Sequence, residues 1–334
     1  MFIIAILAVT TVYFGLKYLN KLTPAKYFNQ RFEKKILISR GDNLLKIAEK
    51  LKTEKLIVSE YYFIFYAKYK KMNTRIKAGE YLIPNNLTNR ELIKILIKGC
   101  NIFYKITIPE GLTNREIASM FAEKLDKRMN FKEDIFLELC QNSGMIKKYT
   151  DIDALTSEGM MFPETYSYNI DDNETSFFKM MLYNFEKKTG PLKKLSMPLS
   201  MSFYDVLKLA AIVEKEAVFS DEMPAIAGVY INRIKQGMNL EADPTVIYAL
   251  GYKKSRLLYD DLKIDSPYNT YKYSGLTPTP ICNPGYNAVY YTIYFELNNY
   301  IFFVAEPGGR HLFSTTNSQH NRNRAYVKKL IKNR

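Results

Sequence analysis

The sequence predicts an α+β protein with an N-terminal transmembrane helix, a small α+β module and a larger α+β domain. Three observations support this. An apolar run opens the chain, short strand and helix patterns alternate after it, and 334 residues with 47% hydrophobic and 25% charged side chains are more than one small globular module needs. The predicted parts are residues 1–20, 21–104 and 105–334.

The N-terminal segment MFIIAILAVTTVYFGLKYL has no charged side chain from Met1 to Leu16. A membrane span needs about 20 apolar residues, so the segment predicts a short transmembrane helix. A cleaved signal peptide is the alternative, but the basic n-region and small-residue cleavage site that it needs are not evident. Lys17, Lys21 and Lys26 follow the span, and by charge alone they favour a cytoplasmic location for the rest of the chain.

The net charge of +14 is concentrated at the two ends of the chain. Residues 17–99 contain 19 basic and 7 acidic side chains, and residues 310–334 contain 7 basic and no acidic ones. The larger excess directly follows the apolar segment, and no base-reading motif accompanies it. This pattern predicts a charged surface near a membrane and argues against nucleic-acid binding.

Cysteine and histidine are too sparse to predict a metal centre or a disulfide framework. Cys100, Cys140 and Cys282 are odd in number, far apart and without a CxxC motif. His311 and His320 are the only histidines, and we expect structural hydrogen bonds from them. An enzyme with this composition must therefore use carboxylates, hydroxyls or lysines.

Residues 36–99 predict a compact α+β unit. The predicted elements are a strand at 36–38, helices at 43–51 and 60–70, a strand at 78–84 and a helix from about 88 to 97. Thr88 and Glu91 have capping-box spacing. The string LTNRE at 87–91 recurs at 112–116, which indicates a repeated strand–turn–helix device rather than a solenoid. The alternative is that good helix caps recur by chance.

Residues 120–200 are predicted to be mainly helical, with one interruption at 158–166. This segment, EGMMFPETY, is unusually rich in apolar and aromatic residues. It predicts either a buried loop that packs against the core or one wall of a cleft.

Residues 205–217 (DVLKLAAIVEKEA) predict a strong helix. Its predicted apolar face consists of Val206, Ala210, Val213 and Ala217. Glu214 and Glu216 lie on the two borders of that face, where partial desolvation raises the pKa of a carboxyl. A raised pKa suits a general acid near neutral pH. The alternative is that one or both pair with lysines, and periodicity does not choose between the two.

The next segments predict two further helices and a long ordered loop. One helix starts at 220–224 and stops at Gly237, and Asp243 is predicted to cap a short helix that ends at Leu250. Residues 265–285 contain four prolines and cannot form regular structure. In a chain without tryptophan, the tyrosines and amides of this loop predict a sugar-binding wall; a rigid spacer is the alternative.

Several strings, taken together and in order, resemble the endolytic murein transglycosylase family (MltG, YceG-like). They are AIVEKE (211–216), VYINR (229–233), DPTVIY (243–248), YNTY (268–271) and NPG (283–285), with Gly309, His311 and His320 near the end. Upstream, AGEY (78–81) and Glu110-Gly111 match the membrane-proximal half of the family, which resembles a LysM-like module. The resemblance covers nearly the whole chain.

The resemblance implies a lytic transglycosylase without metal or cofactor. Its reaction would cleave the β-1,4 bond between N-acetylmuramic acid and N-acetylglucosamine in nascent peptidoglycan, leave 1,6-anhydro ends and end strand elongation. Glu216, the second glutamate of EKE, matches the catalytic acid, and Glu214 matches its companion. The candidate substrate-binding residues are Glu214, Asn232, Arg233, Asp243, Thr245, Tyr248, Tyr268, Asn269, Tyr271 and Asn283.

The resemblance also implies a location and partners. The location is the cytoplasmic membrane, with a single span and the catalytic domain outside the cytoplasm, which is opposite to the expectation from charge. The expected partners are peptidoglycan strands, the membrane and peptidoglycan synthases of the elongation or division machinery. Two alternatives stay open: a muramidase with Glu214 or Asp243 as second carboxylate, and a non-catalytic scaffold that acts through the LysM-like module.

Overall fold

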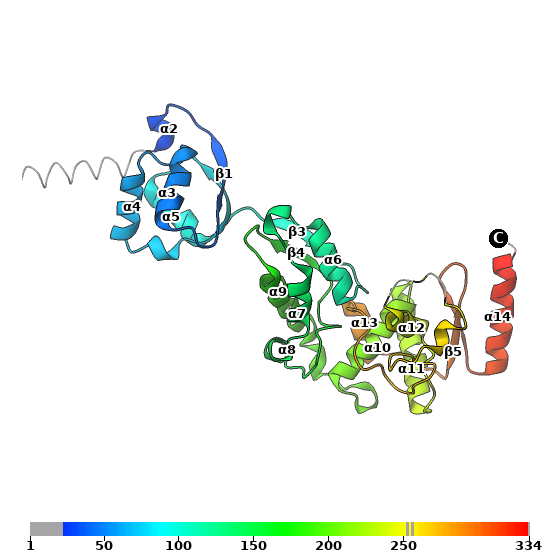
Figure 1. Ribbon diagram of the computed structural model, residues 1–334. Helices are drawn as coiled ribbons and strands as arrows, with labels where there is room; N and C mark the ends of the chain where they lie inside the picture. Colours follow the sequence, from blue (N-terminus) through cyan, green and yellow to red (C-terminus); the bar gives the residue numbers. More distant parts are fainter. Residues whose placement is uncertain (1–22, 252–253, 255–256, 333–334) are drawn as a thin grey trace, which may run out of the picture. The chain divides into compact units, whose positions relative to one another are not determined.

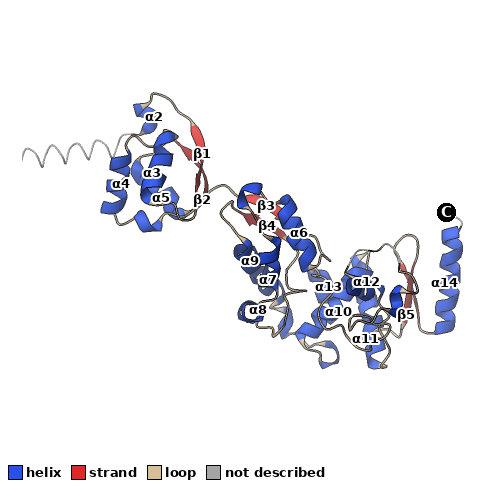
Figure 2. Ribbon diagram, in the orientation of Figure 1, coloured by secondary structure: helices blue, strands red, loops and turns tan. Residues whose placement is uncertain are grey.

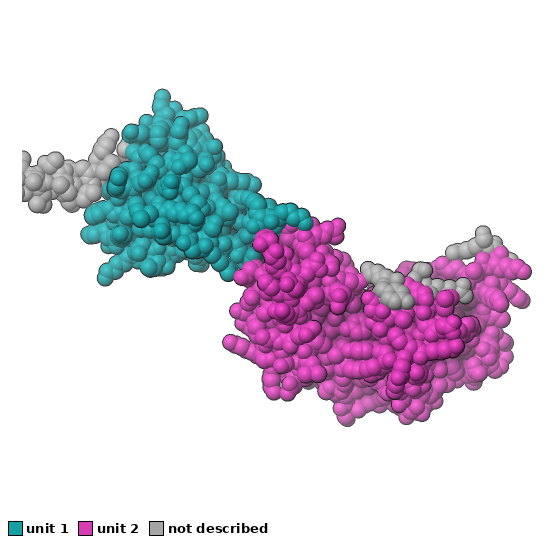
Figure 3. Space-filling model, viewed as in Figure 1, with its two compact units in different colours: residues 1–106, 126–129, 167–172 teal, residues 107–125, 130–166, 173–334 magenta. Residues whose placement is uncertain are grey.

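The computed structural model describes residues 23–251, 254 and 257–332, and it confirms the α+β fold class. The chain forms two compact units (Figures 1 and 3). Unit 1 contains the residues up to Ile106 with segments 126–129 and 167–172, and unit 2 contains 107–125, 130–166 and 173–334. The two inserted segments of unit 1 were not predicted from the sequence.

The predicted membrane span at residues 1–20 lies outside the described residues. Within the ranges that are described, the structure contains no helix that combines the length and the apolar character needed to cross a bilayer. The prediction of a transmembrane anchor therefore stays a prediction.

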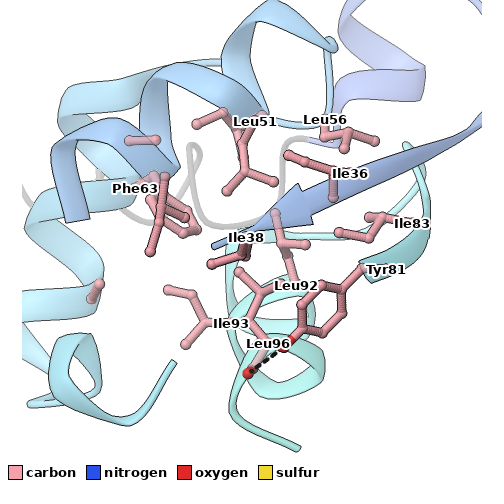
Figure 4. Close-up of a cluster of buried hydrophobic side chains, with 14 of the residues drawn as sticks. Ile36, Ile38, Leu51, Leu56, Phe63, Tyr81, Ile83, Leu92, Ile93 and Leu96 are labelled. Atoms are coloured by element: carbon pink, nitrogen blue, oxygen red, sulfur yellow. Dashed lines mark hydrogen bonds between the residues drawn. The ribbon is translucent and has the colours of Figure 1, made fainter. Parts of the chain in front are cut away.

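Unit 1 packs helices against a two-stranded antiparallel sheet. The sheet pairs β1 (Glu33–Ile38) with β2 (Gly79–Pro84), with Ile36 opposite Tyr81. The helices are α2 (Pro24–Tyr27), α3 (Leu44–Thr53), α4 (Glu60–Tyr69) and α5 (Asn89–Lys98). Figure 4 shows the strand side chains Ile36, Ile38 and Tyr81 meeting Leu51, Phe63 and Ile93 from the helices in one buried core.

The repeated helix start predicted from LTNRE is confirmed. Thr88 and Glu91 form a capping box at α5, and Thr113 and Glu116 form the same box at α6 (Asn114–Lys124). Each box satisfies two backbone N–H groups that the first helical turn leaves without an intrahelical acceptor. The LTNRE string therefore forms the same N-terminal helix cap at two places in the chain.

Unit 2 is mainly helical (Figure 2). β3 (Tyr104–Thr107) and β4 (Thr165–Tyr168) form a two-stranded sheet, and β5 (Phe302–Ala305) pairs antiparallel with β6 (His311–Ser314). The remaining helices are α7 (Glu133–Cys140), α8 (Ser143–Thr150), α9 (Glu174–Thr189), α10 (Phe203–Glu216), α11 (Met223–Lys235), α12 (Asp243–Leu250), α13 (Tyr286–Ile293) and α14 (Asn317–Lys332). Residues 265–285 contain no helix or strand, as predicted.

The helix predicted at residues 205–217 is confirmed as α10, with Val206, Ala210 and Val213 buried, but its end and the width of its buried surface differ from the prediction. Helix α10 ends at Glu216, with Ala217 as its C-cap. Its side chains at Leu207, Leu209, Ala211 and Ile212 are as buried as those of the predicted apolar face. The reason is tertiary, because α11 and α13 both pack against α10 and cover flanks that the periodicity assigned to solvent.

Candidate active site

Glu216 is the last residue of α10, and its carboxyl is partly buried. The hydroxyl of Tyr230, a buried residue of α11, donates a hydrogen bond to Glu216 Oε1 over 2.9 Å. The Tyr230 ring packs edge-on against Phe303 of β5, with centroids 5.8 Å apart. The donor is therefore held by the packing of two elements that are distant in sequence.

Burial raises the pKa of Glu216 to about 7. The hydrogen bond from Tyr230 opposes this shift because it stabilises the carboxylate, and the negative charge of Asp243 adds to it. In the described ranges, no lysine, arginine or histidine forms an ion pair with Glu216. The carboxyl is therefore partly protonated near neutral pH, as a general acid must be.

Asp243 supplies a second carboxylate near Glu216, whose pKa its negative charge raises. The sequence predicted it as a helix cap, but it is the first residue of α12, Ala242 is the N-cap, and no side chain caps the helix. Its Oδ1 instead accepts a 2.6 Å hydrogen bond from the hydroxyl of Tyr271, in the proline-rich loop. The loop, α10, α11 and α12 thus converge on Glu216.

Glu214 is held differently from Glu216. One carboxylate oxygen accepts the backbone N–H of Gly285 over 3.0 Å, just before α13. Burial raises its pKa to about 7, and the charge of Glu110 adds to the shift. A Cβ at position 285 would overlap the Glu110 carboxyl, so any larger residue there would force the Glu110 side chain to move. Glu214 therefore anchors the loop that precedes α13.

Asn232 and Arg233 direct their polar atoms into the protein. Asn232 Nδ2 donates to the carbonyls of Asn298 and Tyr300. The buried guanidinium of Arg233 donates to the Ile301 carbonyl and contacts Glu241 as an ion pair. These contacts hold the segment that leads into β5, and the sugar-binding role of both residues stays a prediction.

The buried polar residues Thr245, Asn269 and Asn283 also make internal hydrogen bonds. Thr245 Oγ1 contacts Ala242 and Thr270. Asn269 donates to the carbonyls of Leu262 and Ile264, and Asn283 donates to the Leu112 carbonyl and to Asn114. They hold loops of unit 2 in place, and their predicted contact with substrate remains untested.

The sequence profile of the YceG-like family matches residues 36–326. The chain belongs to the YceG-like family. A Bacillus subtilis (strain 168) protein named endolytic murein transglycosylase is 33% identical over 304 residues, which cover 86% of this chain and 82% of that relative. A Streptococcus pneumoniae (serotype 2, strain D39) protein of the same name is 30% identical over 339 residues, which cover 93% of this chain and 61% of the relative.

A solved structure is similar to this chain in both sequence and fold. The crystal structure of a YceG-like protein from Listeria monocytogenes has 30% sequence identity to this chain and a TM-score of 0.57. The match covers 87% of this chain and 98% of the Listeria chain. The similarity in fold and the family match therefore agree.

This YceG-like protein contains a buried carboxyl that sequence reasoning missed. Glu158 is 5% exposed, its Oε1 accepts the N–H of Asn114 over 3.0 Å, and burial raises its pKa to about 8. It lines a cavity of about 580 Å³ in unit 2 together with Tyr248, whose ring packs on Tyr268 at 4.9 Å. The sequence signal was one acidic residue at the head of the apolar loop 158–166, which is largely buried and lines this cavity through Glu158 alone.

Proposed function

We propose that this YceG-like protein is an endolytic murein transglycosylase with Glu216 as its catalytic acid. Its substrate is the β-1,4 bond between N-acetylmuramic acid and N-acetylglucosamine within a peptidoglycan strand. The observation that carries the proposal is the partly buried carboxyl of Glu216, which accepts a tyrosine hydroxyl and has no cationic partner among the described residues, in a chain whose relatives bear that name.

The proposed reaction needs one group that first gives and then takes a proton. Protonated Glu216 donates to the leaving glycosidic oxygen as the C1–O bond breaks and an oxocarbenium-like centre forms. The Glu216 carboxylate then accepts the proton of the muramyl C6 hydroxyl, whose oxygen attacks C1 and closes the 1,6-anhydro ring. No water is consumed, and Glu216 regains its proton.

Tyr230 and Asp243 support these steps through charge. The Tyr230 hydroxyl stabilises the carboxylate that remains after the first proton transfer, because it donates to Oε1. The Asp243 carboxylate, fixed by Tyr271, favours the positive charge that develops at the sugar. A second carboxylate near Glu216 also favours the hydrolase alternative, in which Asp243 would activate a water molecule.

The membrane location is part of the same proposal. Residues 1–20 anchor the chain in the cytoplasmic membrane with a single span, and unit 2 acts outside the cytoplasm. Unit 1 is a LysM-like module beside the wall polymer, and synthases of the elongation or division machinery are the protein partners. The apolar run supports the span, and the basic residues after it suit a surface near anionic lipid. The extracytoplasmic side rests on the family resemblance, because the lysines after the span by themselves favour the cytoplasm.

The test uses the full chain in detergent with uncrosslinked glycan strands, followed by mass spectrometry of the fragments. Wild type should release internal fragments that end in 1,6-anhydromuramic acid, and Glu216→Gln should release none. Glu138→Gln, a change at an exposed carboxylate of α7, is the matched control and should cleave normally. Fragments heavier by one water would mean a hydrolase, and strand binding without cleavage would mean a scaffold.

A further inference from the structure

Helix α4 of unit 1 carries a stripe of large aromatic side chains on its outer surface. Tyr61, Phe65 and Tyr69 are 87%, 50% and 68% exposed. They are spaced four residues apart, so they lie on one face of the helix. The opposite face is buried in the core of unit 1 through Tyr62, Phe63, Tyr66 and Ala67.

The stripe is ordered and is accompanied by lysines. The Phe65 and Tyr69 rings stack with centroids 6.0 Å apart and planes within 6°. Lys70 Nζ lies 4.9 Å from the Tyr69 ring centroid, and Lys68 shares the face of Tyr61 by helical periodicity. Single exposed apolar residues are common, but three adjacent aromatic rings on one face indicate an interaction surface.

The chemistry of this surface matches a lipid–water interface. Tyrosine rings gather at the headgroup level of membranes, and lysines near an anionic surface are attracted to it. Residues 17–99, most of unit 1, carry 19 basic against 7 acidic side chains, so their excess charge is complementary to anionic lipid.

The chain enters unit 1 beside the end of α3, the helix that packs against α4. The ring of Phe28, which directly follows α2, lies 6.0 Å and 5.7 Å from Nζ of Lys52 and Lys55 at the end of α3. Helix α4 begins a few residues later. Only residues 17–22 separate the apolar run from the first described residue, a reach of roughly 20 Å.

We propose that the aromatic stripe of α4, formed by Tyr61, Phe65 and Tyr69 with Lys68 and Lys70, rests on the anionic lipid interface. The contact orients unit 1 on the membrane surface. It goes beyond the proposed activity, and it rests on the proposed anchor at residues 1–20.

The test exploits the absence of tryptophan from this chain. Phe65→Trp in the full chain creates a single reporter on the stripe. Phe103→Trp is the matched control, because Phe103 is 57% exposed in the same unit and follows Ile102, whose N–H bonds to Glu80 of β2. Figure 2 shows β1 and β2 on the side of unit 1 opposite α4.

Both variants are reconstituted into vesicles of phosphatidylcholine, with and without phosphatidylglycerol, that contain brominated lipid. Tryptophan emission of the Phe65→Trp variant should shift to shorter wavelength and be quenched, most strongly in the anionic vesicles. Emission of the Phe103→Trp variant should stay unchanged. Lys68→Gln combined with Lys70→Gln should remove the difference between the two lipid compositions.

Three results would overturn the proposal, and they are distinguishable. If the chain floats with the vesicles while Phe65→Trp and Phe103→Trp give the same emission, the stripe is refuted and the anchor is kept. If the chain does not float with the vesicles, both the anchor at residues 1–20 and the lipid contact of the stripe are refuted. A shift of the Phe65→Trp emission on addition of glycan strands alone, without a shift on vesicles, would assign this face to the wall polymer. None of these readouts depends on catalytic activity.

Discussion

At the residue scale, the state of Glu216 is a balance between burial and two neighbours. Burial raises the carboxyl pKa, Tyr230 lowers it by donating to the carboxylate, and the charge of Asp243 raises it. Because the two neighbours act in opposite directions, removing either one should move the pH dependence of cleavage in a direction that is known beforehand.

Tyr230→Phe should shift the alkaline limb of the pH–rate profile upward by about one pH unit, because the carboxylate loses a donor and keeps its proton longer. Asp243→Asn should shift the same limb downward, because a negative charge that favours the protonated form is removed. The measurement is the initial rate of strand cleavage between pH 5 and 9 (a range of about two units on each side of neutrality). Shifts of equal sign would contradict this account of Glu216.

At the scale of elements, α11 packs closely against the segment before β5, and the contact is made at Gly228 of α11. The N–H of Glu296 donates to the carbonyl of Pro224 over 3.0 Å, and Asn232 donates to the carbonyls of Asn298 and Tyr300. A Cβ at Gly228 would lie 2.5 Å from the carbonyl oxygen of Glu296. The segment that makes this contact continues into β5, where Phe303 packs on Tyr230.

Gly228→Ala should lower the free energy of unfolding by about 1–3 kcal/mol, because a backbone carbonyl must move to admit the methyl group. Thermal unfolding would show this as a lower midpoint temperature. Gly144→Ala in α8 is the matched control, since its Cβ would meet only ordinary contacts and alanine favours a helix by roughly 0.5–1 kcal/mol. Equal effects of the two changes would refute the close-packing argument.

At the scale of the whole molecule, unit 1 is assembled from segments that are far apart in sequence. Arg128, in the inserted segment 126–129, donates to Glu80 Oε1 over 3.0 Å. Glu80 is buried, and its other oxygen accepts from the Tyr104 hydroxyl. The ion pair and the hydrogen bond hold the pKa of this carboxyl below its ordinary value although burial opposes them. The inserted segment therefore helps to stabilise the unit.

Arg128→Ala should destabilise unit 1 by about 1–3 kcal/mol, because a buried carboxylate loses its cationic partner. Hydrogen–deuterium exchange resolved by peptide should speed up in β2 and not in α10 or α13. Arg75→Ala changes an exposed arginine of the same unit and should leave exchange unaltered. Faster exchange throughout both units would show that they do not unfold independently.

The sequence by itself determined the features that depend on near neighbours. The capping boxes at α5 and α6 need residues only three positions apart, and the irregular loop 265–285 follows from the φ restriction of its prolines. The apolar periodicity of residues 205–217 placed Glu214 and Glu216 on one helix, which is α10. Local geometry was sufficient in each case, because the interacting groups are covalently close.

Only the tertiary structure decided what surrounds these residues. It buried α10 on nearly all sides, brought the Tyr230 hydroxyl to Glu216 and turned Asp243 from an expected cap into the partner of Tyr271. It also enclosed Glu158 beside Asn114, a contact between positions 44 residues apart. Desolvation and long-range hydrogen bonds depend on which elements pack together, and periodicity along one helix carries no information about that.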